Sequence, residues 1–123
     1  MQYGTCFARY LSMAKKVFIR QNSWLARLVA KKLGFLRVAV VIDRNIYLHN
    51  ATVQEFMKNR RWLLHELKHV EQYEVGLFRF FKEYFSEYRK NGYDNNRFEI
   101  EARQAENDTK LLEKYDLSLY MML

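Results

Sequence analysis

The chain has 123 residues, a mass of 15.1 kDa and a formal net charge of +7, and half of its residues are hydrophobic. This length and composition fit a single folded domain over residues 1–123 and exclude an intrinsically disordered chain. The longest apolar run, 38–42, is too short for a membrane-spanning helix, and the single cysteine, Cys6, excludes an internal disulfide. The N-terminus lacks the apolar core of a secretory signal, so a cytoplasmic location is expected.

The positive charge is concentrated in the first third of the chain. Residues 1–42 contain eight basic side chains and no acidic one, whereas residues 43–123 contain thirteen basic and fourteen acidic side chains. Such a basic region can contact nucleic acid, an anionic membrane surface or an acidic partner. The basic residues alternate with apolar ones, as in an amphipathic helix packed on a core, and we favour this second interpretation.

The predicted elements form an α+β, mostly helical fold with one small β-hairpin. Residues 5–33 are expected to form one or two helices, with Ser23 capping the second and Gly34 ending it. The branched and aromatic residues of 36–42 and 46–49 flank a polar turn, which is typical of a β-hairpin. A hairpin alone is only marginally stable in water, so it must pack on the helices or join further short strands.

Three more helices are predicted after the hairpin. Thr52 and Glu55 form a capping box that starts a helix ending near Gly76. Its buried side is expected to consist of Val53, Phe56, Leu63, Leu67 and Val70. A helix over roughly 77–90 carries aromatic residues at helical spacing, which favours core packing, and a last helix runs from Asn96 to about residue 115.

Residues 65–69 contain the pattern His-Glu-x-x-His. On a helix, His65 and His69 lie one turn apart on the same face and can bind one divalent ion, and Glu66 is placed to accept a proton from an attacking water. A catalytic zinc keeps three protein ligands and one open position, so a third ligand is expected downstream. Spacing alone leaves Glu99 and Glu101 as rivals, because they lie about 200° apart on a helix. The alternative is that the histidines are ordinary helix residues and the carboxylates only favour a helix N-terminus.

The octapeptide HELKHVEQ at 65–72, followed by FEIEA at 98–102, resembles the gluzincin zinc metallopeptidases. Residues 62–103 look most like the compact minigluzincins, which are related to the catalytic domains of CaaX prenyl proteases and heat-shock membrane peptidases. The pattern is also similar to small bacterial domains of largely unknown function. The resemblance implies a zincin-like fold and a zinc metalloendopeptidase in which His65, His69 and Glu99 bind Zn²⁺ and Glu66 is the catalytic base and acid. It selects Glu99 because the family's ligand glutamate stands three residues before the alanine.

The resemblance also implies features around the metal. The strand over 46–49 would run along the cleft and pair with an extended peptide or protein substrate. Many relatives have Asp four residues after the ligand glutamate, as a support for a histidine, where this chain has Arg103. Either Glu106 or a backbone carbonyl then supports the histidine, or the site is weakened. The residues considered as donors to a developing oxyanion are His49, Tyr73 and Tyr93.

A second class of function remains open from the residues alone. The chain can be a non-enzymatic or degenerate metal-binding interaction module that docks through its basic N-terminal region. A nucleic-acid partner is not expected, because the aromatic residues between 73 and 98 follow helical spacing instead of forming a stacking platform. The apolar tail, 117–123, either completes the core, which we favour, or lies in the cleft and keeps an enzyme latent.

Overall fold

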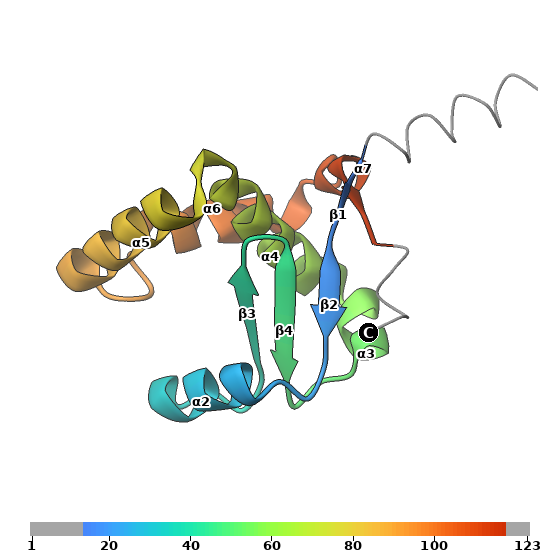
Figure 1. Ribbon diagram of the computed structural model, residues 1–123, viewed down its shortest axis with the longest axis horizontal. Coiled ribbons are helices and arrows are strands. Elements are labelled where there is room, and N and C mark those ends of the chain that lie inside the picture. Colours follow the sequence, from blue (N-terminus) through green and yellow to red (C-terminus); the bar gives the residue numbers. More distant parts are fainter. Residues whose placement is uncertain (1–13, 118–123) are drawn as a thin grey trace, which may run out of the picture.

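The structure is a computed structural model that describes residues 14–117 (Figure 1). Cys6, the beginning of the predicted helix over 5–33, and all of the tail after Leu117 lie outside the described residues. The fold is α+β and mostly helical, as predicted. No helix within residues 14–117 is both long enough and apolar enough to cross a bilayer.

A three-stranded sheet lies between two helical layers. Its strands are β2 (Phe18–Arg20), β3 (Val38–Ile42) and β4 (Asn45–His49). Helix α2 (Trp24–Leu33) packs on the sheet face formed by Val38, Val40 and Tyr47. Helices α3 (Val53–Lys58) and α4 (Arg60–Gln72) pack on the opposite face, where the main core lies. Figure 1 shows α4 behind the strands and α2 at their lower end.

The predicted helix over 5–33 is wrong for residues 15–20. These residues form strands β1 (Lys15–Lys16) and β2 instead. Val17 and Ile19 are fully buried, and Ile19 pairs with Ile46 in the parallel ladder between β2 and β4. Branched side chains favour extended backbone, and a partner strand is available, so strand pairing outweighs the helical spacing of the apolar residues.

Helix α2 begins and ends where the sequence predicts. The Ser23 hydroxyl accepts a hydrogen bond from the backbone N–H of Ala26, and Gly34 adopts a left-handed conformation with φ of 76°. Gly34 tolerates this conformation because it lacks a Cβ. The expectation that the apolar residues of this helix all pack on the core is wrong, since Trp24 and Leu28 are exposed.

The predicted hairpin is confirmed, and it joins further strand pairing. β3 and β4 are antiparallel across a two-residue turn in which Asp43 has φ of 56°. The sheet order is β2-β4-β3, so β4 is the central strand. The prediction that 46–49 pairs with a substrate is therefore wrong, because both edges of β4 are already hydrogen-bonded to neighbouring strands.

The helix predicted from Thr52 to about Gly76 is divided into α3, α4 and the 3₁₀ turn η1 (Tyr73–Val75). Thr52 caps α3 as predicted, and the five residues of the predicted stripe are all buried. Asn59 interrupts the helix because its side-chain oxygen accepts from the backbone N–H of Trp62 and so caps a new helix, α4.

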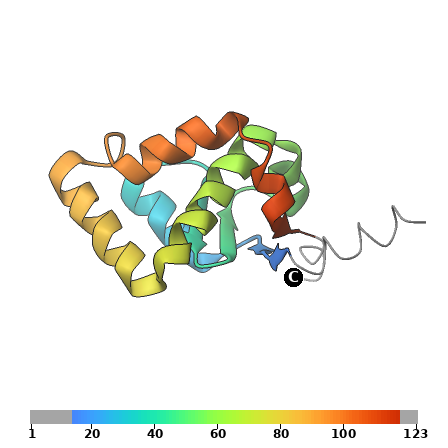
Figure 2. The ribbon, with the colours of Figure 1, turned by 90° about the horizontal axis from the view of Figure 1, so that it is seen from above.

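The C-terminal elements wrap along α4 (Figure 2). They are α5 (Leu77–Asn91), α6 (Arg97–Gln104), the 3₁₀ turn η2 (Ala105–Asn107), α7 (Leu111–Lys114) and β5 (Tyr115–Asp116). Asn96 caps α6 as predicted, but the single last helix to residue 115 is wrong. The helical residues that begin with α6 and continue through η2 end before Asp108, because the Asp108 carboxylate accepts a hydrogen bond from the backbone N–H of Lys110 in a local turn.

Two predictions about apolar segments have mixed outcomes. The α5 aromatics do not all pack in the core: Phe80 is buried, whereas Phe78 and Phe85 are exposed. Their spacing is helical, but it also places aromatic residues on the part of α5 that other elements within residues 14–117 leave exposed. At the chain end, Leu117 packs on the main core, and β5 pairs with β1 just before it. The rest of the tail lies outside the described residues, so its two interpretations stay open.

Candidate metal centre

The two histidines of the His-Glu-x-x-His pattern lie on α4, one turn apart. Helix α4 begins at the Asn59 cap, and its buried side packs under the sheet through Leu63, Leu64 and Leu67. His65 and His69 therefore have side chains at the edge of the core, with ring centroids 5.1 Å apart. His69 is buried and His65 is partly buried. Their Nε2 atoms point toward the same place, as their spacing on the helix predicts.

Glu99 completes the cluster from a separate helix. The Asn96 cap fixes the start of α6, and Glu99 lies in the first turn. Its Oε1 atom is 3.2 Å from the Nε2 atoms of both His65 and His69. One ligand atom from each residue lies within 4.8 Å of the others, which makes this a group that could hold a metal ion. Two ligands of a tetrahedral zinc lie about 3.4 Å apart when each is about 2.1 Å from the ion.

The rival carboxylate, Glu101, faces away from the two imidazoles. Its side chain is exposed, and it accepts a hydrogen bond of 3.2 Å from the Gln72 amide. Glu99, by contrast, is 3% exposed. The angular separation of about 200° on the helix therefore resolves the choice, and Glu99 is the carboxylate that shares a site with the histidines.

Each of the three candidate ligands is held by a further side chain. The Nδ1–H of His65 donates to Glu106 at 3.0 Å, and the Nδ1–H of His69 donates to Gln72 at 2.8 Å. The hydroxyl of Tyr84 donates to the second oxygen of Glu99 at 2.7 Å. Such partners fix the tautomer and orientation of metal ligands. With Nδ1 donating in both rings, both Nε2 atoms face Glu99 Oε1; they donate to it when protonated and can bind a metal ion when neutral.

Glu106 provides the support for His65 that the sequence left undecided, because this chain has Arg103 where many relatives have the supporting aspartate. It is one of the two supports considered for the missing aspartate, and its other oxygen forms an ion pair with Arg61 at 3.3 Å. Arg103 itself points elsewhere and donates to the backbone carbonyl of Asp94. The substitution of Asp by Arg at this position therefore leaves His65 with a carboxylate partner.

The pKa shifts of the cluster favour protonated imidazoles beside an ionised Glu99. Burial by itself lowers the pKa of His65, but hydrogen bonds to Glu99 and Glu106 and the nearby charges of Glu66 and Glu99 raise it to about 9. The pKa of His69 is also raised: burial lowers it, and the contacts with Glu99 outweigh that effect. Burial raises the pKa of Glu99, but hydrogen bonds from His65 and His69 hold it well below its usual range. Protons or a metal ion can neutralise this group.

Glu66 lies beside the cluster with the properties of a proton acceptor. It is buried, and burial raises its pKa to about 7 against the opposing charges of His69 and His65. A carboxylate with a pKa near neutral pH can both take and return a proton, which general acid–base chemistry requires. Its position one residue from His65 keeps it close to the cluster without making it part of the three-residue group.

The three predicted oxyanion donors have different positions. Burial, followed by the charges of Glu99 and Glu66, raises the pKa of Tyr93, so its phenol lies near the site. Tyr73 instead donates to the backbone carbonyl of Val41 at 2.7 Å. His49 ends β4 opposite Val38 and is not in the metal-binding group found among residues 14–117.

Sequence reasoning did not identify Tyr84 or the role of Gln72. The aromatic residues of 77–90, which include Tyr84, are expected to pack in the core, and Gln72 appears only as the last residue of the octapeptide at 65–72. No local sequence signal distinguishes Tyr84 from its aromatic neighbours, because its role depends on how α5 packs beside α6. Gln72 could have been found, since it lies three residues after His69 on the same helix face.

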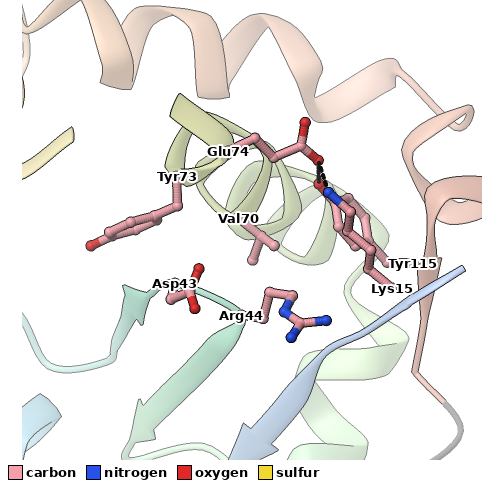
Figure 3. A pocket seen from close by; sticks show the side chains of 7 residues that line it. All are labelled: Lys15, Asp43, Arg44, Val70, Tyr73, Glu74 and Tyr115. Carbon is pink, nitrogen blue, oxygen red and sulfur yellow. Dashed lines mark hydrogen bonds and ion pairs between the residues drawn. The ribbon is translucent and has the colours of Figure 1, made fainter. Parts of the chain in front are cut away.

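A separate cavity of about 390 Å³ lies between β1, the β3–β4 turn and the end of α4 (Figure 3). None of the three candidate ligands lines it. The charged groups around it are Lys15, Asp43, Arg44 and Glu74, and Glu74 is paired with Lys15 and hydrogen-bonded by Tyr115. Since the cationic and anionic groups balance, this cavity has no evident preference for a charged ligand.

Comparison of the chain with protein-family models, curated protein sequences and solved structures finds no match in any of the three. The function of this chain is therefore inferred from the geometry of its site. A buried His65–His69–Glu99 group that could hold a metal ion is what that geometry establishes.

Proposed function

We propose that this protein is a zinc-dependent metallopeptidase of the gluzincin type that acts on peptide or protein substrates in the cytoplasm. The observation that carries the proposal is the convergence of His65, His69 and Glu99 from two helices, with Oε1 of Glu99 3.2 Å from both imidazole nitrogens. Two imidazoles and one carboxylate are the donor set of many catalytic zinc sites, and three protein ligands leave one position open.

The residues of the chain have distinct tasks in this proposal. A bound zinc ion would supply Lewis acidity that activates water and polarises a carbonyl. Glu66 accepts the proton of the attacking water on its carboxylate and returns it to the leaving amine, which its pKa of about 7 permits. Tyr93 is the donor toward the developing oxyanion, and Tyr84 is a positioning residue that holds the free oxygen of Glu99.

The edge strand β3 replaces 46–49 as the proposed docking strand for substrate. It is an edge of the three-stranded sheet, and it contacts α4. Tyr73, which directly follows α4, is hydrogen-bonded to Val41 of β3 and so fixes this strand beside the helix that carries the histidines. An extended peptide can add to such an edge through backbone hydrogen bonds.

Elemental metal analysis tests the metal half of the proposal. Wild type is expected to hold about one zinc per chain after purification, Glu99→Ala to lose it, and the exposed neighbour Glu101→Ala to retain it. Absence of zinc binding in the wild type, or equal loss in both variants, would contradict the assignment. The comparison is matched, because both variants remove one carboxylate from the same helix.

Peptide hydrolysis tests the catalytic half. Glu66→Gln is expected to keep its zinc and to lose hydrolysis of a mixed peptide library analysed by mass spectrometry. Retained hydrolysis in this variant contradicts the role of Glu66. If the wild type binds zinc but cleaves no peptide, with and without the tail after Asp116, the peptidase proposal fails and a non-enzymatic metal-binding module is left.

A further inference from the structure

The outward face of helix α2 carries large apolar side chains. Trp24 is 74% exposed and Leu28 is 55% exposed, and they lie one turn apart on the same face. The inward face carries the buried Ala26 and Ala30, which allow the helix to lie close to the sheet. Just beyond the end of the helix, Leu36 is 84% exposed. The largest apolar groups of this segment therefore point into solvent, away from the core.

Basic side chains flank these apolar groups on both sides. At about 100° per residue, Arg27 and Lys31 lie on one side of the line from Trp24 to Leu28, and Lys32 lies on the other. None of these three cations forms an ion pair within residues 14–117. The part of the chain described before Asp43 contains no acidic residue at all. The outward face of α2 is thus apolar at its centre and has basic side chains at its margins.

We propose that α2 is a docking element for the surface of an anionic lipid bilayer. Tryptophan and leucine are suited to the boundary between headgroups and acyl chains, and lysine and arginine beside them pair with headgroup phosphates. A nucleic-acid surface fits less well, because its phosphates require cations at the centre of the face, where Trp24 and Leu28 lie. The proposal does not depend on the metal centre, since α2 and α4 pack on opposite faces of the sheet.

Tryptophan fluorescence tests whether this face meets lipid. The chain has two tryptophans, so Trp62→Phe leaves Trp24 as the only one. We expect its emission to shift to shorter wavelength, and to be protected from acrylamide, with vesicles containing phosphatidylglycerol and not with pure phosphatidylcholine vesicles. An unchanged emission with the anionic vesicles, or an equal change with single-stranded RNA, overturns the proposal.

Co-sedimentation with the same vesicles tests which residues are responsible. Lys31→Gln with Lys32→Gln is expected to reduce partitioning on the order of tenfold, and Trp24→Ser by at least about fivefold. Phe78→Ser is the matched control, because Phe78 is 83% exposed but lies on α5. Undiminished binding of the α2 variants, or an equal loss in the Phe78 variant, would show that α2 is not the docking element. Circular dichroism verifies that each variant is folded.

Discussion

In its metal-free form, this protein should become less stable as the pH rises above neutrality. In the metal-free chain, the imidazoles of His65 and His69 face the buried carboxylate of Glu99. Protons on these imidazoles then neutralise the carboxylate. When the pH rises, those protons are lost and the buried negative charge is left without a counterion, which is costly in a region of low dielectric constant.

The magnitude follows from the pKa of His65. It rises from an ordinary value of 6.5 to about 9 in the folded chain. The folded state binds this proton more tightly than the unfolded state, so the stabilisation is complete below pH 6.5 and is lost as the pH rises through 9. At about 1.4 kcal/mol for each pKa unit, this contribution is about 3 kcal/mol. Glu66 acts in the same direction at lower pH, because its pKa is raised from 4.5 to about 7.

Urea unfolding between pH 6.5 and 9.5, in the presence of a chelator, measures this decrease. A Cys6→Ser background removes the titration of the thiol. Glu106→Gln keeps an acceptor for His65 but removes the charge, so the decrease should begin at lower pH, whereas Glu101→Gln should keep the wild-type profile. A free energy of unfolding that is constant or increases over this range would refute the reasoning. Added zinc should reverse the trend, because it binds the deprotonated imidazoles.

Three further predictions concern residues around the site and the chain end. Glu106→Ala should weaken zinc binding about 10- to 100-fold in competition with a chromophoric chelator, because His65 loses the acceptor of its Nδ1–H. Tyr84→Phe should weaken zinc binding several-fold in the same assay and leave the thermal midpoint of the metal-free protein nearly unchanged, since the ring contacts remain. Truncation after Asp116 should lower the free energy of unfolding by about 1 kcal/mol or more, because Leu117 packs on the core. An unchanged free energy of unfolding together with new peptidase activity would instead support a tail that blocks the cleft.

Local signals in the sequence predicted the ends of helices well. Ser23, Gly34, Thr52 and Asn96 each act at the predicted position, because a cap depends on a few neighbouring residues. The same chemistry explains an error at Asn59. Its side chain was available to cap a helix, but the apolar periodicity runs through it without interruption, so the division into α3 and α4 was not expected.

Strand β2 could not be predicted because its stability comes from residues far away in the chain. It has three residues, and its partner β4 lies more than twenty positions later. Three residues are too few to show an alternating pattern, and the surrounding spacing of apolar residues suits a helix equally well. This error also changes the proposed substrate site, because β2 covers the edge of β4 on which the sequence predicts that a substrate docks.

The candidate metal centre also combines residues that the local sequence identifies with residues that it does not. His65 and His69 are identified by their spacing, and the family resemblance selected Glu99 over Glu101. Tyr84 and Glu106 support the cluster from elements that fold against α4, and their roles become visible only in three dimensions.

The supporting side chains also bear on whether the His-Glu-x-x-His pattern is accidental. An accidental pattern on a surface helix would leave its histidines solvated and its neighbours unrelated to them. Here a buried carboxylate from another helix lies 3.2 Å from both imidazole nitrogens, and both Nδ1 atoms have acceptors that leave Nε2 directed at that carboxylate. Burying Glu99 in this way costs free energy unless a cation compensates its charge. Protons on the imidazoles or a bound metal ion can supply this compensation. The fold directs all three side chains toward one point, which an accidental pattern does not explain.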